Sequence, residues 1–278
     1  DLEETAFVLA FEVLDNLPHD KILFDSDGNI WEAVIVDRGQ RPNPDIRKPR
    51  RVYDFLLSFA YGERKTLKSD KHKELFRKAL DPLVLRTVDL MQQAEEERVK
   101  LLANESQARS FENPFKFWNV RHSKTGVLAT ASAIRNKQGI VYVPTGQLQF
   151  LDALQRCIPR HCLILSDFDS LPGMVMHGAG GPAVQSIGAA NNRLCDHSSY
   201  LLPGDTSADI FFPTDFLALK ALYEKLVGIP AQIQSASEFF APFPESIEKC
   251  TTLSGYCPLT QYYQNTSYLI SQFPANGN

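Results

Sequence analysis

The apolar and polar positions near the start of the chain form its clearest pattern. Residues 7–11 are an unbroken apolar run that leads into Glu12, Asp15 and Asn16 and ends at Pro18. A short apolar run without alternation predicts a strand buried on both faces, as in a parallel sheet. Ligands of open α/β sheets bind just outside the carboxyl ends of the strands. We therefore expect Glu12, Asp15 and Asn16 at the rim of a ligand site; a core strand with a polar turn is the plain alternative.

Two further patterns predict strands together with their connections. The β-rich runs 21–24 and 30–36 are joined by a polar turn with Gly28, which is typical of a hairpin. Farther along, the apolar run 139–144, a helical pattern over 148–154 and the apolar run 162–169 follow one another. A strand, a helix of about a dozen residues and a strand form a βαβ unit, so these two strands should be parallel.

The segment between these patterns has a different character. Residues 38–51 contain five arginines, one lysine and three prolines, which predicts an irregular connecting loop. Contact with an acidic partner or with RNA phosphate is the alternative role of this loop. Residues 52–107 have a helical pattern, and Pro82 should break or kink its second helix. We interpret this region as an inserted helical segment.

The second half of the chain continues the α/β pattern. Residues 209–216 lead into a helix over 217–227, for which Thr214 or Asp215 is the expected N-cap and Gly228 the stop. Residues 229–243 predict a last strand and a short helix, and the polar, aromatic end from Tyr262 should be frayed. The fold class is therefore α/β. Its core covers 1–37 and 136–245, with a basic loop and helical insertion at 38–135 and a C-terminal tail at 246–278.

Composition and charge narrow the class of protein. With 278 residues, of which 44% are hydrophobic, the chain can bury a core of its own. A net charge of -4 and a pI near 5.9 argue against a nucleic-acid surface spread over the whole molecule. No apolar run reaches the roughly 18 residues that a membrane span needs. Because the chain begins without an initiator methionine, we expect a mature form or part of a longer protein.

Cysteines and histidines indicate no metal site. The five cysteines are an odd number without a disulfide framework, so we expect reduced thiols. Neither the pair Cys157 and Cys162 nor the pair Cys250 and Cys257 has the spacing of a zinc ribbon. His197 stands in a polar run and is the histidine we single out, with a plain surface position as its alternative role.

Carboxylates at strand ends are the main candidates for chemistry. Glu12, Asp15, Asp167, Asp169 and Asp209 all follow or begin a predicted strand, so a parallel sheet would gather them on one rim. Such a rim can accept hydrogen bonds from ribose hydroxyls or from a cationic substrate. A guanidinium is the obvious cation, because two carboxylate oxygens match its planar fork.

Several stretches of the chain form an ordered set of motifs. Residues 12–18 resemble a segment "N-E-hydrophobic-hydrophobic-D-A-L-P", and residues 163–168 resemble an apolar run ending in "D-Y-G". Pro203-Gly204 with residues 209–216 resembles "P-G…D-I-T-A-H-V-D-F", and residues 233–240 resemble "T-Q…F-L". In this order the motifs resemble those of the MidA-like S-adenosylmethionine-dependent methyltransferases, a family that includes the mitochondrial arginine methyltransferase assisting assembly of respiratory complex I. The resemblance runs across residues 6–245, with the helical segment as a larger or divergent insertion.

The chain also departs from the family pattern. Phe11 stands for the Asn before the glutamate, Phe211 and Pro213 stand for a Thr and a His, and Asp169 stands for the Gly of "D-Y-G". A family glutamate is replaced around residues 144–145. The Gly-rich loop that holds the cofactor in such enzymes is expected before residue 1, so this chain corresponds to the carboxyl-terminal half of a methyltransferase-type Rossmann sheet.

The resemblance implies methyl transfer from S-adenosylmethionine to a protein arginine in the mitochondrial matrix. Glu12 and Asp15 would be the catalytic residues that orient the guanidinium. The residues implied in substrate binding or support are Asn16, Asp167, Asp209, Asp215 and His197. The rival hypothesis is a catalytically inactive scaffold, either an assembly factor or a subunit of a large mitochondrial complex, with protein partners. A cofactor-free hydrolase is a third hypothesis, for which the sequence identifies no pair of nucleophile and base.

Overall fold

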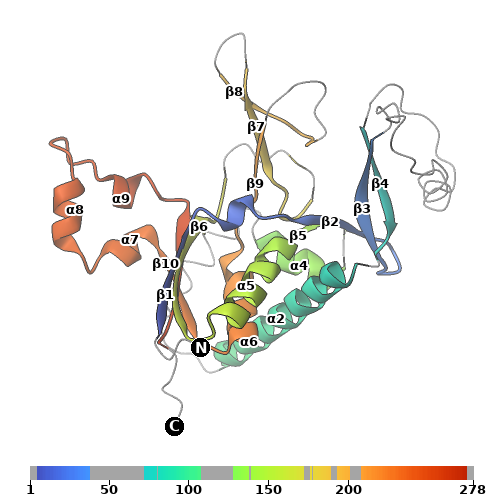
Figure 1. Ribbon diagram of the computed structural model, residues 1–278, viewed down its shortest axis with the longest axis horizontal. Helices are drawn as coiled ribbons and strands as arrows, with labels where there is room; N and C mark the ends of the chain where they lie inside the picture. Colours follow the sequence, from blue (N-terminus) through green and yellow to red (C-terminus); the bar gives the residue numbers. More distant parts are fainter. Residues whose placement is uncertain are drawn as a thin grey trace.

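Figure 1 shows the computed structural model of the chain. It describes residues 5–37, 72–79, 81–107, 128–137, 139–171, 176, 178–188, 193–200 and 208–273. The basic loop expected at 38–51, the first part of the helical segment at 52–71 and Pro203-Gly204 lie outside these residues. No helix in the described ranges is long and apolar enough to cross a membrane.

The first sheet has the strand order β1-β6-β11-β10. Its strands are β1 (Ala6–Phe11), β6 (His161–Phe168), β11 (Thr266–Ser271) and β10 (Ala231–Ser235). β1 and β6 are parallel, with Ala6 opposite His161 and Phe11 opposite Ser166. β11 runs antiparallel to both of its neighbours, β6 and β10.

Helices lie on one side of this sheet. They are α2 (Pro82–Gln107), α4 (Leu128–Asn136), α5 (Thr145–Cys157) and α6 (Phe216–Val227), gathered on the same side of β1 and β6 (Figure 1). Leu163, Leu165 and Leu269 are the sheet's fully buried contribution to this core, and Phe216 and Leu222 of α6 pack into the same cluster. As expected, Asp215 caps α6 by accepting a hydrogen bond from Ala218 N–H, and Gly228 ends it in the left-handed conformation.

The strand predicted at the start of the chain is confirmed, but the prediction that it is buried on both faces is wrong. Ala10 points into the helical core, whereas Phe7, Leu9 and Phe11 on the opposite face are 67%, 61% and 53% exposed. The reason is position, because β1 is the edge strand of the sheet among the described residues and its outer face has no covering helix there.

The second sheet has the order β4-β3-β2-β5 and is antiparallel throughout. Its strands are β2 (Asp20–Phe24), β3 (Ile30–Asp37), β4 (His72–Lys78) and β5 (Gly139–Val143). The predicted hairpin of β2 and β3 is therefore confirmed. The predicted parallel pairing of β5 with β6 is wrong, because β5 pairs with β2 while β1 and β11 occupy the two edges of β6.

The expected helical insertion also differs in detail. Residues 72–78, which carry a helical pattern, form strand β4 against β3. Pro82 does not kink a helix but is the first residue of α2, where a proline has no intrahelical N–H bond to lose. The described part of segment 38–135 is thus β4, α2 and α4 rather than helices alone.

A third, small sheet and a helical excursion complete the molecule. The sheet β8-β7-β9 consists of β7 (Ala183–Ile187), β8 (Leu194–Asp196) and β9 (Asp209–Phe211), and it projects away from the core (Figure 1). The excursion between β10 and β11 consists of α7 (Ala236–Phe240), α8 (Pro244–Cys250) and α9 (Pro258–Gln261).

The expectation of a frayed tail is wrong for its central part, because β11 lies inside the first sheet. The polar residues of β11, which obscured the strand pattern in the sequence, form buried hydrogen bonds. Ser271 Oγ accepts a hydrogen bond from Leu163 N–H at 2.7 Å, and Ser267 Oγ donates to Asp169 Oδ2 at 2.7 Å.

Candidate functional site

The carboxyl ends of β1 and β6 meet at one edge of the first sheet, as the pattern predicts. Glu12 follows β1 directly, and its N–H donates to Ser166 O of β6 at 2.9 Å. The chain then turns through the short 3-10 helix η1 (Leu14–Asn16). Asp167, one residue beyond Ser166, lies beneath this turn. The structure therefore brings Glu12, Asp15, Asn16 and Asp167 together at one rim.

Asp167 holds the turn in place. Its Oδ2 accepts hydrogen bonds from the N–H groups of Leu14, at 2.7 Å, and Asp15, at 3.1 Å. Its Oδ1 accepts a third from Phe168 N–H at 2.8 Å. Because the side chain is fully buried and its oxygens face backbone donors, Asp167 positions the rim rather than contacting a substrate.

Asp15 is buried as well, with 1% of its surface exposed. Its Oδ1 accepts a hydrogen bond from Asn16 Nδ2 at 2.7 Å, so Asn16 itself lies at the exposed end of the pair. Burial raises the pKa of Asp15. Burial, and then the charge of Asp15, raise the pKa of Asp167 to about 7. The two carboxyls form a buried acidic pair under the rim.

Glu12 differs from this pair in both exposure and backbone. Its side chain is exposed, and its backbone has φ 52°, in the left-handed region that non-glycine residues rarely adopt. Within the described residues, Lys137 is the other non-glycine residue with a positive φ. Strained backbone of this kind persists where the surroundings fix it, and it clusters at functional sites.

The remaining predicted residues do not join the rim. Asp209 is exposed on β9 of the projecting sheet, and Asp215 is the N-cap of α6. Asp169 is buried and accepts a hydrogen bond from Ser267. His197 follows β8, where its Nε2 is 2.7 Å from Ser186 Oγ across the strand pair.

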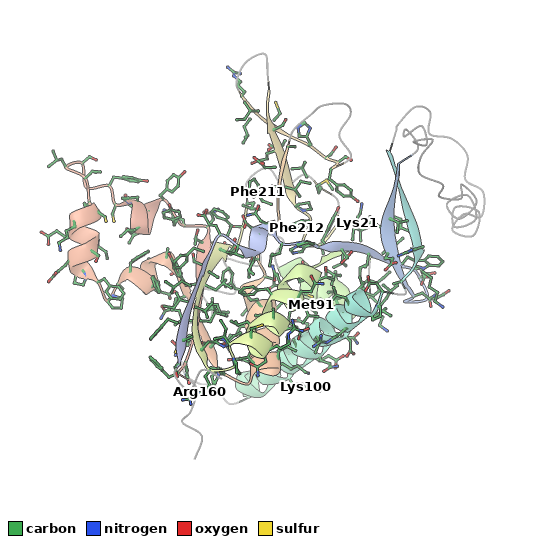
Figure 2. All side chains as sticks on the ribbon, viewed as in Figure 1. Lys21, Met91, Lys100, Arg160, Phe211 and Phe212 are labelled. Atoms are coloured by element: carbon green, nitrogen blue, oxygen red, sulfur yellow. The ribbon has the colours of Figure 1, made fainter. Side chains whose placement is uncertain are left out.

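His19 is a residue near the rim that the sequence pattern did not single out. Its ring stacks on Phe212 with 3.9 Å between centroids and a 5° angle, and its Nδ1 lies 2.9 Å from Leu17 O. Phe211 and Phe212 lie where β9 approaches the start of β2 (Figure 2). Burial lowers the pKa of His19 to about 4, so the ring is neutral at pH 7. Its position directly after the segment 12–18 was the available signal.

The space beside His19 is small. A cavity of about 20 Å³ is lined by His19, Tyr142, Gln147 and Asp215 among others. That volume holds a single water molecule, not a substrate side chain. His19 therefore belongs to the support of the rim. No cluster of three or more metal-ligating side chains occurs in the part of the chain that the structure describes.

Comparison with known families is consistent with a mixed α/β core. A family model described as "Putative S-adenosyl-L-methionine-dependent methyltransferase" matches residues 1–234 of the 278. The chain belongs to this methyltransferase family, whose cofactor is S-adenosylmethionine. No curated protein matches the chain.

The buried acids and the glycine-containing stretch of the described residues offer little to that cofactor. The buried acceptors Asp15 and Asp167 already accept hydrogen bonds, so they offer little to a ribose. Other protein atoms already occupy the space beside the glycines of residues 178–181. A Cβ on Gly178 would lie 2.7 Å from Ile140 Cγ2, and one on Gly180 would lie 2.4 Å from Thr130 Oγ1. The groups that the rim presents to solvent are the carboxylate of Glu12 and the amide of Asn16.

Proposed function

We propose that this chain serves methyl transfer to an arginine side chain of a protein, in mitochondria and in the assembly of a large complex. The supporting observation is Glu12, an exposed carboxylate held in a left-handed backbone conformation at the carboxyl end of β1. A carboxylate in this position accepts two N–H bonds from a guanidinium and so fixes the orientation of its remaining nitrogen. Orientation of this kind lowers the barrier of a group transfer by positioning.

The role of Asp15 changes from the expected direct contact to support. Because Asp15 is buried beside Asp167, it shapes the turn that carries Glu12 and Asn16. The strand order β1-β6-β11-β10, with β11 antiparallel, supports the proposal that this sheet is the carboxyl-terminal half of a methyltransferase-type Rossmann sheet.

A catalytically inactive scaffold is the second candidate function. Two observations favour it: the buried Asp15 and Asp167 already accept hydrogen bonds, and the apolar Phe211 and Pro213 stand where the resemblance expects polar groups. In that case the same fold would act only through contacts with protein partners of the complex.

Calorimetric titration of the full-length protein, including whatever precedes residue 1, with S-adenosylmethionine separates the two functions. Binding heat supports the enzyme, whereas a folded sample without heat at millimolar ligand contradicts it and favours the scaffold.

Transfer of a radioactive methyl group to a mitochondrial protein fraction should then fall at least a hundredfold in Glu12→Gln. The matched control is Glu248→Gln, an exposed carboxylate on α8, which should retain full transfer. Equal transfer by both variants would remove Glu12 from the site.

A further inference from the structure

A cavity of about 180 Å³ lies where the helical excursion leaves β10 and returns to β11. Its walls are the start of α7 on one side and the end of α9, with the turn that follows it, on the other. Unlike the cavity of about 20 Å³ beside His19, it has room for several water molecules, and so for the end of a polar side chain. The family match ends at residue 234, so the whole lining lies outside it. The lining residues are Ser235, Ala236, Ser237, Thr260, Tyr263 and Gln264.

Contacts within the excursion hold both walls of this cavity in place. The excursion lies on the side of the first sheet away from α5 and α6 (Figure 1). There Phe239 of α7 stacks on Tyr268 of β11, with 4.1 Å between ring centroids and an angle of 4°. On the other wall, Cys257 N–H donates to Gln261 Oε1 at 3.2 Å across the single turn of α9. The cavity is therefore a fixed feature of the fold.

The lining of the cavity is polar and carries no charge. Neither the phenol of Tyr263 nor the carboxamide of Gln264 has a hydrogen-bond partner among the described residues. Glu238, on the same turn as Ser235, has its Oε2 engaged by the N–H and the Oγ of Ser235, each at 2.7 Å. A charged ligand would lose its hydration here without meeting an opposite charge, whereas a neutral group with donors and acceptors exchanges water for hydrogen bonds.

A carboxamide fits this lining best. It offers one C=O and two N–H groups, so it can pair with both the C=O and the N–H of Gln264. The hydroxyls of Ser237 and Tyr263, which line the same cavity, can then bond its remaining N–H and lone pair. Asparagine and glutamine are the side chains that carry this group.

The register of the first sheet places the cavity in one row with Glu12. Asp167 lies opposite Ser267, and Ser267 lies opposite Ser235, the last residue of β10. Glu12 bonds to Ser166, the neighbour of Asp167. Because β11 is antiparallel to both β6 and β10, the strands β1, β6 and β10 all end at this edge, where the ligands of α/β sheets bind. With strands about 4.8 Å apart, Ser235 lies roughly 14 Å along the edge from Glu12.

We infer that the cavity binds an asparagine or glutamine side chain of the substrate polypeptide, about four residues from the arginine that is methylated. An extended chain advances about 3.3 Å per residue, so about four residues span the roughly 14 Å between Glu12 and the cavity. The cavity then selects the substrate by its sequence, while Glu12 orients the reacting group. The position of the arginine rests on the proposed function, whereas the carboxamide site is argued from the cavity itself.

A peptide scan with the full-length protein tests the inference. Peptides of about 13 residues carry an arginine at the centre of a glycine and alanine sequence, and one asparagine is moved through the other positions. Fluorescence polarisation should show binding about tenfold tighter when the asparagine stands about four residues from the arginine, on one side of it, than for the peptide without asparagine. A flat profile, or no binding at about 1 mM peptide, would mean that the cavity holds water only and would overturn the inference.

Replacement of the lining carboxamide provides the second measurement. Gln264→Leu should abolish the advantage of the asparagine peptide and leave the affinity for the peptide without asparagine unchanged. The matched control is Gln272→Leu, an exposed glutamine at the opposite edge of the sheet, where its N–H bonds to Pro230 O. This control should retain the advantage. An advantage that survives Gln264→Leu combined with Tyr263→Phe would place the asparagine elsewhere and contradict the inference.

The scan separates a failure of this inference from a failure of the proposed function. Because it measures binding, a clear asparagine preference without methyl transfer contradicts the proposed function alone. Transfer to the arginine with a flat binding profile contradicts the inference alone. Where both hold, the asparagine should lower KM and leave kcat unchanged, because it binds away from the reacting group and equally in the ground state and the transition state.

Discussion

The two faces of the first sheet are built from similar residues and have opposite environments. On the helical face, Leu163, Leu165 and Leu269 are fully buried against α5 and α6. On the outer face, Leu9 and its two phenylalanine neighbours are mostly exposed. A hydrophobic side chain can therefore be buried, but the arrangement of helices and strands around it determines whether it is. The same contrast separates the buried carboxyls Asp15 and Asp167 from the exposed Glu12.

Truncation of one leucine on each face should give the largest difference. Leu165→Ala should lower the free energy of unfolding by about 2–5 kcal/mol, because it leaves a cavity in a closed core. Leu9→Ala in the isolated chain should change it by less than about 0.5 kcal/mol, because the side chain is already in solvent. Urea unfolding of both variants measures the difference. Similar losses for the two would show that the outer face is covered within the chain itself.

The buried acid at the rim should make stability depend on pH. The pKa of Asp167 is about 7 in the folded protein and 3.8 in the unfolded chain, so the folded state holds the proton more tightly. This contribution is fully present below pH 4 and is lost as the pH rises to about 7. Since a tenfold change in proton affinity is about 1.4 kcal/mol, the loss is at most about 4 kcal/mol. Asp167→Asn should flatten this slope in unfolding curves measured between pH 4 and pH 7, and an unchanged slope would assign it elsewhere.

His19 should give the opposite slope in the same pH range. Its pKa is about 4 when folded and 6.5 when unfolded, so the unfolded chain takes up the proton first as the pH falls. The stability contributed by neutral His19 is present above pH 6.5 and is lost towards pH 4. Since a tenfold change in proton affinity is about 1.4 kcal/mol, the loss is at most about 3 kcal/mol. His19→Gln should remove it from the same unfolding curves, and NMR titration of the ring would contradict the assignment if the pKa were near 6.5.

The smallest expected effect concerns the strained backbone of Glu12. Glu12→Gly should raise the free energy of unfolding by about 0.5–1 kcal/mol, because glycine adopts φ 52° without strain. Lys137→Gly, at φ 49°, is the matched control and should give a similar gain. Methyl transfer should be lost only in the Glu12 variant. Thermal unfolding and the transfer assay together check this pair, and a stability loss in Glu12→Gly would mean that the turn imposes no strain.

Local signals in the sequence predicted the elements that depend on neighbours in the chain. The hairpin of β2 and β3, helix α5, and the Asp215 cap and Gly228 stop of α6 are all confirmed. Partner choice between strands was not predictable in this way. β5 joins β2 instead of β6, and β11, with serines and a threonine in it, becomes an inner strand because β6 and β10 satisfy its backbone on both sides.

The local sequence is enough to place a strand at the start of the chain and the acids that follow it. What each acid can do depends on contacts between segments that are far apart in the chain. Asp167 lies 153 residues from Leu14, whose N–H it accepts, and the two segments meet because β1 and β6 pair in parallel. Burial and pKa depend on such distant neighbours. For that reason Asp15 and Asp167 became internal supports of the rim, while Glu12, a few residues away, is left exposed at its edge.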